Sequence, residues 1–305
     1  MVSGIERWSM KTVEEYLSHC YSIPEIPSVL PLPAETFVES WKEAAGKEAL
    51  DFLVEISGSS NMVFPLKDKD ALHIFLKETL GGPLPVIVTG NHGDFLSVEA
   101  MLNGREVLSG IPVTVNAFTM SARADKISGH RVILLGRAPY SNVPAQQLGL
   151  EEELWLERSF RLRLAHECVH YETLRLFGDM QNHALDEIVA DAIGQIAAFG
   201  NFSAERQRLF FGLEKGTGRC TGRLSFYCRG VLPWEREKVY RSVDTVLGII
   251  EAELTRFLAG KAEPPATKGA VSDFSDILSH KKVKYELLAL LSGTSIAEKI
   301  GNRKK

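Results

Sequence analysis

His166-Glu-Cys-Val-His170 forms an HExxH string near the middle of this 305-residue chain. Residues four apart lie on one face of an α-helix, so a helix here would direct both imidazoles at one metal ion with Glu167 beside it. The surrounding residues, from about 150 to 177, contain neither Pro nor Gly, and their apolar positions recur at helical spacing. The sequence therefore predicts a long helix over 150–177 with a metal site on its half-buried face.

A second helix is predicted over 184–194, after a stop signal at Gly178 and a short polar loop. Glu187 and Asp191 are four residues apart in it and share one face. A catalytic zinc takes three protein ligands and leaves a fourth position for water, so Glu187 can complete a His, His, Glu set. Asp191 can accept the free N–H of a ligating imidazole and fix its tautomer. We therefore predict a Zn²⁺ site made by both motif histidines and Glu187.

From residue 165 to residue 195 the chain resembles the active-site segment of gluzincin metallopeptidases of the thermolysin type. It carries HECVH, sixteen intervening residues, and then Glu187 within Leu-Asp-Glu-Ile-Val-Ala-Asp. In that family a Glu-x-x-x-Asp helix follows HExxH, after a spacer slightly longer than the one here. The resemblance implies a zinc peptidase in which Glu187 is the third ligand and Asp191 supports a ligating histidine.

Other ligand sets are open to test on the same residues. The metzincin extension requires Gly at position 173 and His at position 176, where this chain has Thr173 and Leu176, so that class is excluded. His183 also follows the motif and is the alternative third ligand, but it lies in the polar loop without an acidic partner at helical spacing. Asp186 is interpreted as a solvated neighbour or as a first-turn acid that complements the helix dipole.

The predicted roles define a mechanism. Bound zinc lowers the pKa of its water toward neutrality and polarises a carbonyl group. Glu167 is then the general base, which takes the proton from that water and delivers it to the leaving amine. A further donor must help zinc to hold the oxyanion, and the unranked candidates are Tyr171, Tyr227, Tyr240 and His280. Cys168, at a variable position of the motif, is interpreted as a packing residue.

Two functional hypotheses follow from this pattern. The first is a zinc metallopeptidase that acts on a peptide or protein substrate. The second is a non-catalytic or regulatory protein that keeps a zinc site on a gluzincin scaffold and acts by binding a partner. Cleavage preference and oligomeric state have no signal in the sequence.

Composition narrows the class of partner and the compartment. The chain is 45% hydrophobic and 24% charged, as ordinary globular domains are, and its net charge of −4 gives no basis for binding nucleic acid or an anionic membrane. Its four cysteines show neither disulfide nor metal-knuckle spacing. The N-terminus has no signal-peptide pattern, and no stretch approaches the roughly 18 apolar residues of a membrane span. These features favour a cytoplasmic protein.

Around the motif, two regions differ in pattern. Residues 1–147 combine predicted helices at about 34–56 and 68–80 with predicted strands at 84–89, 111–117 and 131–136. Residues 148–305 are mainly helical, with further helices predicted at about 203–214, 232–260 and 282–298. We therefore expect an α+β fold, in which a small mixed or antiparallel sheet precedes a helical, zincin-like active-site region. An edge strand of that sheet could hold an extended peptide beside the zinc.

Three smaller segments complete the prediction. Residues 262–269 are expected to form an exposed linker, and residues 302–305 a frayed tail. Val88-Thr-Gly-Asn-His-Gly-Asp94 has some likeness to a zinc-binding turn of carboxypeptidase-like deacylases, but Phe95 occupies the position that requires Glu. We interpret it as a polar turn between a strand and a helix, with His92 as a residue that could line the cleft.

Overall fold

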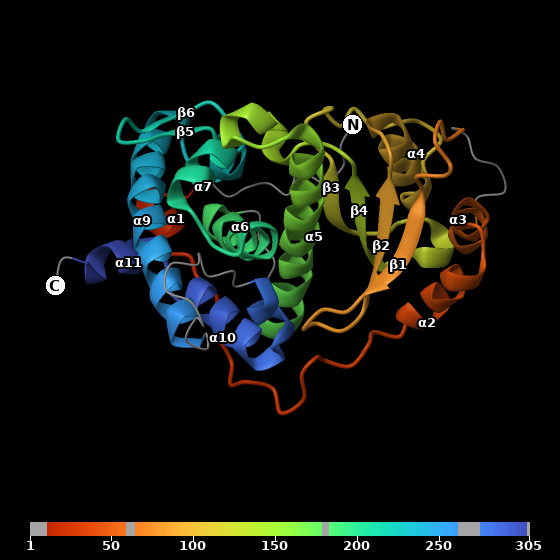
Figure 1. Ribbon diagram of the computed structural model, residues 1–305, viewed down its shortest axis with the longest axis horizontal. Coiled ribbons are helices and arrows are strands. Elements are labelled where there is room, and N and C mark those ends of the chain that lie inside the picture. The colour runs from red at the N-terminus through yellow and green to blue at the C-terminus, as the bar shows by residue number, and fades with distance from the viewer. Residues whose placement is uncertain (1–10, 59–64, 179–182, 262–274, 304–305) are drawn as a thin grey trace.

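The computed structural model describes residues 11–58, 65–178, 183–261 and 275–303, with helices around two sheets (Figure 1). The larger sheet has the strands β1 (His73–Lys77), β2 (Leu84–Thr89), β3 (Ala117–Ser121) and β4 (Arg131–Gly136) in the order β1-β2-β4-β3. β2 and β4 are parallel, while the two outer pairs are antiparallel. The smaller sheet is the antiparallel pair β5 (Leu213–Glu214) and β6 (Arg219–Cys220). The predicted α+β class with a small mixed sheet is confirmed.

The helices both precede and follow the sheet in the chain. The first four are α1 (Val13–Leu17), α2 (Val38–Trp41), α3 (Ala49–Ser57) and α4 (His92–Leu102). The others are α5 (Glu152–Phe177), α6 (Ala184–Phe199), α7 (Ala204–Phe211), α8 (Leu224–Tyr227), α9 (Arg236–Lys261), α10 (Lys281–Ser292) and α11 (Ile296–Asn302). Short 3₁₀ turns lie between them, at Lys42–Gly46, Asp125–Ile127, Tyr140–Asn142, Ala145–Leu148, Cys228–Gly230, Pro233–Glu235 and Ser275–Ser279.

α5 is the central helix of the molecule, with the large sheet on one side and α6 on the other (Figure 1). Cys168 and Tyr171 of α5 pack on one face of the sheet, against Leu84, Val86, Ile133 and Leu135. The opposite face is covered by α3 and α4. Cys168 is therefore a packing residue, as predicted, and the motif helix is held firmly by the sheet.

α6 lies directly against α5 because a glycine removes the side chain at their contact. A Cβ atom on Gly194 would lie 2.8 Å from the carbonyl oxygen of Leu162. This distance is too short for a real Cβ atom, so only glycine fits here. The other sides of α6 are enclosed by the largest apolar cluster, which includes residues of α9 and α10. The face of α6 that carries Glu187 is consequently fixed toward the motif helix.

The predicted helix at 68–80 is wrong, because this segment contains strand β1. Along β1 the exposed His73, Phe75 and Lys77 alternate with the partly buried Ile74 and Leu76. That period of two suits a strand, and pairing with β2 provides the backbone hydrogen bonds. The predicted strands at 84–89 and 131–136 are confirmed as β2 and β4.

The other differences are breaks within predicted elements. The strand predicted at 111–117 begins only at Ala117, because Val113 lies in a turn whose carbonyl accepts the Asn116 side-chain amide. The helix predicted at 34–56 is divided into α2, a 3₁₀ turn and α3. The helix predicted at 203–214 ends at Phe211, since Gly212 has φ +63° and the chain enters β5.

At the C-terminal end, the helix predicted at 282–298 is interrupted at Gly293, and a capping box at Ser295 starts α11. The helices predicted at 150–177, 184–194 and 232–260 correspond to α5, α6 and α9. The predicted linker at 262–269 lies outside the described residues. Within the described part of the chain, no helix has both the length and the apolar character needed to cross a membrane.

Candidate metal centre

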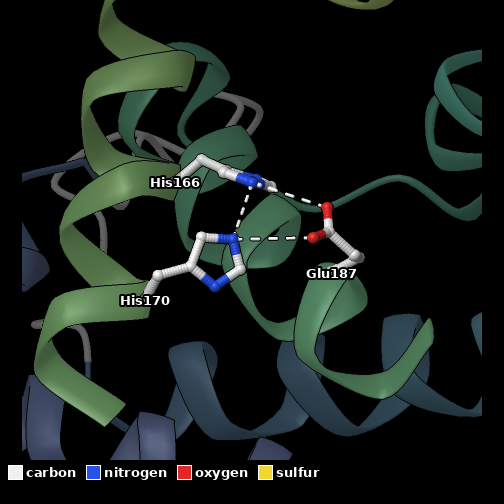
Figure 2. Close-up of side chains that lie close together, drawn as sticks. All are labelled: His166, His170 and Glu187. Atoms are coloured by element: carbon white, nitrogen blue, oxygen red, sulfur yellow. Dashed lines mark hydrogen bonds and ion pairs between the residues drawn. The ribbon is translucent and has the colours of Figure 1, made fainter. Parts of the chain in front are cut away.

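Two packed helices bring three potential metal ligands together. His166 and His170 lie one turn apart on α5, and Glu187 faces them from the first turns of α6 (Figure 2). The Nε2 atoms of the histidines are 3.1 Å apart, and the Glu187 carboxylate oxygens lie 3.5 Å from His166 Nε2 and 3.6 Å from His170 Nε2. Ligands at zinc-bond lengths in a tetrahedron are about 3.3 to 3.5 Å apart. We call these three residues the metal cluster, and its geometry fits zinc.

The metal cluster is nearly closed to solvent, which sets its protonation. Burial raises the pKa of Glu187, although His166 and Arg223 oppose that rise. Burial and the neighbouring His166 lower the pKa of His170 to about 4, so its imidazole is neutral near pH 7 and keeps a lone pair for a metal. For His166, burial would lower the pKa, but the hydrogen bond to Asp191 raises it overall.

Asp191 anchors His166 from behind. Its Oδ1 lies 2.8 Å from His166 Nδ1 and accepts from the hydroxyl of Tyr140, and its Oδ2 accepts from Gln207 and Arg223. Burial would raise the pKa of this carboxyl, but the Arg223 charge and the hydrogen bonds hold it well below its usual range. An ionised carboxylate only accepts, so Nδ1 of His166 must carry the hydrogen. In the neutral imidazole, the Nε2 lone pair then faces the metal cluster.

Arg223 contacts two of the three acids of α6, Glu187 and Asp191. Its guanidinium lies 3.2 Å from Glu187 Oε2, contacts Asp191, and donates to the hydroxyl of Tyr227 at 3.2 Å. The backbones of Gly212 and Gly222, on either side of the β5–β6 hairpin, lie in close contact. A Cβ atom on Gly212 would be 2.5 Å from the Gly222 backbone. The β5–β6 hairpin thus returns the chain to α6 and places Arg223 against both acids.

Glu167 lies outside the metal cluster and has a partner of its own. Its side chain is 7% exposed, and its Oε2 accepts a hydrogen bond from the Thr119 hydroxyl at 2.8 Å. Thr119 belongs to β3, the edge strand that packs beside α5. The predicted general base is thereby placed between the motif helix and the edge of the sheet.

Of the four residues considered for oxyanion binding, the structure brings Tyr227 to the centre, through Arg223. Tyr171 faces the sheet side of α5, where its hydroxyl donates to Glu35 at 2.9 Å. Tyr240 is buried in the core around α9. His280 precedes α10, and among the described residues it has no hydrogen bond or ion pair with the metal cluster. Tyr227 is therefore the candidate that the geometry retains.

His183, the alternative third ligand, has a different position. It is the N-cap residue of α6, its ring stacks on Tyr16 with centroids 4.3 Å apart, and its Nε2 lies 3.2 Å from Lys11 Nζ. Asp186 accepts from the His183 backbone N–H and is buried, so it is a first-turn acid and not a solvated one. His92 lies in the first turn of α4, with its ring stacked on Phe95.

Four contributors to this site have no motif in the sequence: Thr119, Tyr140, Gln207 and Arg223. Each reaches Glu167 or Asp191 from 16 to 51 residues away in the chain. Only the fold brings them close. The sequence contains an indication for Arg223 alone: Glu187 and Asp191 share one face of α6, and buried acids require a cation nearby.

Comparison with known proteins adds one finding. Residues 114–260 match a protein family described as a family of unknown function, DUF7005. The matched segment contains β3, α5, α6, the β5–β6 hairpin and Arg223, which follows that hairpin. No curated protein and no solved structure matches the chain. The class of site, a His, His, Glu cluster on two packed helices, therefore rests on the geometry itself.

Proposed function

We propose that this protein is a zinc-dependent hydrolase of peptide bonds, in which His166, His170 and Glu187 hold Zn²⁺ and Glu167 is the general base. One observation carries the proposal. Three donor atoms from two helices converge at metal-bridging distances, while a further buried carboxylate stands beside them without joining the cluster. A site with three ligands and an adjacent base is the arrangement that a hydrolytic zinc requires.

The charge of the site supports a divalent cation. Three acids, Glu167, Glu187 and Asp191, are buried there. Among the described residues, Arg223 contacts two of them and the buried Arg163 interacts electrostatically with Glu167, so three acids and two guanidinium groups leave one negative charge when His166 is neutral. Buried charges are costly unless they are balanced. A metal ion at the three donor atoms would supply the balance, and the nitrogen-rich donor set favours zinc over magnesium or calcium.

The side chains divide the chemistry between them. Bound zinc would supply an acidified water and polarise the scissile carbonyl. Glu167 accepts the proton from the water and passes it to the leaving nitrogen. Asp191 keeps His166 in the Nδ1–H tautomer throughout, and the Tyr227 hydroxyl, which contacts Arg223 beside Glu187, is the proposed donor to a developing oxyanion.

A peptide substrate is favoured by the position of β3. This strand pairs with β4 on one side only, and among the described residues no strand covers its other edge. An extended peptide can add to such an edge through main-chain hydrogen bonds. Because Thr119 of β3 contacts Glu167, a peptide bound there would lie next to the general base.

The burial of the ligands is the observation that favours the second candidate, a zinc-binding protein without catalysis. His166 and Glu187 are 5% and 4% exposed, which suits a closed structural site. Structural zinc sites, however, usually take four protein ligands, often cysteines, and the cluster found among the described residues has three. The three-ligand set therefore favours the hydrolase.

The two candidates are separated by Glu167→Gln. We expect zinc-loaded wild type to cleave members of a random peptide library, and the variant to lose about 10² to 10⁴ of that rate while it still holds one zinc. Glu157→Gln, the same change at an exposed site of α5, is the matched control and should keep full activity. A zinc-loaded wild type that cleaves nothing would favour the binding protein.

A further inference from the structure

We propose that Thr119 is a positioning residue, which fixes the carboxylate of Glu167 and ties it to the open edge of β3. This inference rests on the proposed function and extends it, because it states how the base and an extended substrate come into register. It concerns a strand residue outside the HExxH and Glu-x-x-x-Asp segments.

The hydroxyl of Thr119 lies within hydrogen-bond distance of two oxygen atoms of Glu167. Its Oγ1 lies 2.8 Å from Glu167 Oε2 and 2.8 Å from the Glu167 backbone carbonyl oxygen. Among the described residues, Thr119 is the protein group that hydrogen-bonds this carboxylate. A hydroxyl carries a single hydrogen, so Thr119 donates it to the carboxylate or shares it between these two oxygens. The other carboxylate oxygen, Oε1, stays available to a water molecule.

The pairing of β3 determines which way the Thr119 backbone faces. Asn116 accepts from Gly136, and Ala122 donates to His130, so the even-numbered residues of β3 are the ones that bond to β4. Antiparallel pairing alternates along a strand, and the N–H and C=O groups of Ala117, Thr119 and Ser121 therefore face away from β4. Thr119 presents its main chain to the open edge and its hydroxyl to the general base.

The same alternation sets the side-chain directions. Phe118 and Met120 pack in the cluster on the α3 and α4 face of the sheet, and Ala117 packs in the cluster on the α5 face. Thr119 shares the α5 face with Ala117. A peptide strand paired with the main chain of Thr119 would therefore lie beside the residue whose hydroxyl contacts the Glu167 carboxylate.

Thr119→Val tests this role, because valine keeps the size and β-branching of threonine and removes the hydroxyl. We expect kcat for a cleaved peptide to fall about 10- to 100-fold with little change in KM, since a misplaced base impairs chemistry and not binding. Thr119→Ser should recover most of kcat. Zinc content and thermal unfolding are measured on each variant, and Thr114→Val, at an exposed position, is the control for the substitution itself.

Crystal structures of the metal-free proteins give a readout that does not require activity. In the wild type and in Thr119→Ser we expect one Glu167 conformer in contact with the hydroxyl, and in Thr119→Val several conformers. An active wild type with a fully active Thr119→Val overturns the inference and leaves the proposed function intact. Equal losses in Thr119→Val and Thr119→Ser overturn it as well. A wild type that binds zinc but cleaves nothing overturns the proposed function, and the role of Thr119 with it.

Discussion

Two polar clusters lie at the start of α6, and among the described residues one of them has its donor atoms arranged for a metal. The metal cluster directs three donor atoms at one point (Figure 2). The second, which we call the cap cluster, contains Lys11, His19, His183 and Asp186. Its side chains pair with one another and with the chain around them. His183 bonds to Lys11 and stacks on Tyr16, while Asp186 caps the helix and lies 4.0 Å from His19. Histidines and acids at close range are therefore insufficient, because the donor atoms must also converge.

The sign of the nearest charge separates the two clusters as well. His166 faces Asp191 and Glu187, which are acids that favour a cation beside it. His183 faces Lys11, and burial together with that charge lowers the pKa of His183 to about 3. A metal ion at His183 would be repelled by the ammonium group, whereas one at the metal cluster would be attracted. The convergence of the donor atoms and the nearby ammonium group thus both favour Glu187 over His183 as the partner of the two motif histidines.

The largest expected effect is on zinc affinity, and it should distinguish Glu187 from its neighbour Asp186. Glu187→Ala should weaken zinc binding by about 1,000-fold or more, because it removes one of three ligands and leaves Arg223 without one of its partners. Asp186→Ala, one residue earlier, should leave zinc affinity near the wild-type value and lower stability by about 1 kcal/mol through the lost cap. Zinc affinity is measured by competition with a chromophoric chelator.

Thermal unfolding of both alanine variants shows whether each remains folded. Equal loss of zinc in the two variants would remove the distinction between the clusters. Retention of zinc by Glu187→Ala, together with its loss in His183→Ala, would transfer the third-ligand role to the cap cluster.

A smaller effect is expected from the residues behind His166. Asp191→Asn should weaken zinc binding about 10- to 100-fold. The asparagine side chain has one acceptor oxygen and no charge, so it cannot accept from His166 and also from Gln207 and Arg223 as the carboxylate does. Tyr140→Phe removes one of the donors to Asp191 and should cost less than Asp191→Asn. The same chelator competition measures both variants. A greater loss in Tyr140→Phe than in Asp191→Asn would contradict the order of support that the hydrogen bonds indicate.

The chain predicts its local features better than its long-range contacts. HExxH and Glu-x-x-x-Asp have fixed helical spacing, so the sequence alone predicts the faces of α5 and α6, and the fold brings their four ligand and support residues together. Strand β1 does not follow from the sequence pattern, because its five residues gain their backbone partners only from β2. Helix propensity in that segment is weaker than the pairing that the tertiary structure provides.

The same limit applies to the site. Tyr140 and Arg223 contact Asp191 across 51 and 32 residues of chain, and neither lies in a pattern that indicates a role. Thr119 lies just beyond the strand predicted at 111–117, so the strand pattern does not include it. What fixes its contact with Glu167 is the packing of β3 on α5, which depends on both elements at once.

The smallest effect is a pH dependence of stability that belongs to the cap cluster. Burial lowers the pKa of His183 to about 3, below the value of about 6.5 for an unfolded histidine. As the pH falls below about 6.5 the unfolded chain binds a proton that the folded protein does not, so stability decreases as the pH falls toward 3. Between pH 7 and pH 5.5 this residue alone should cost about 1 kcal/mol. Urea unfolding of metal-free wild type and His183→Gln at both pH values measures this cost. The variant should lose about 1 kcal/mol less than the wild type. An equal loss in both would show that folding does not lower the pKa of His183.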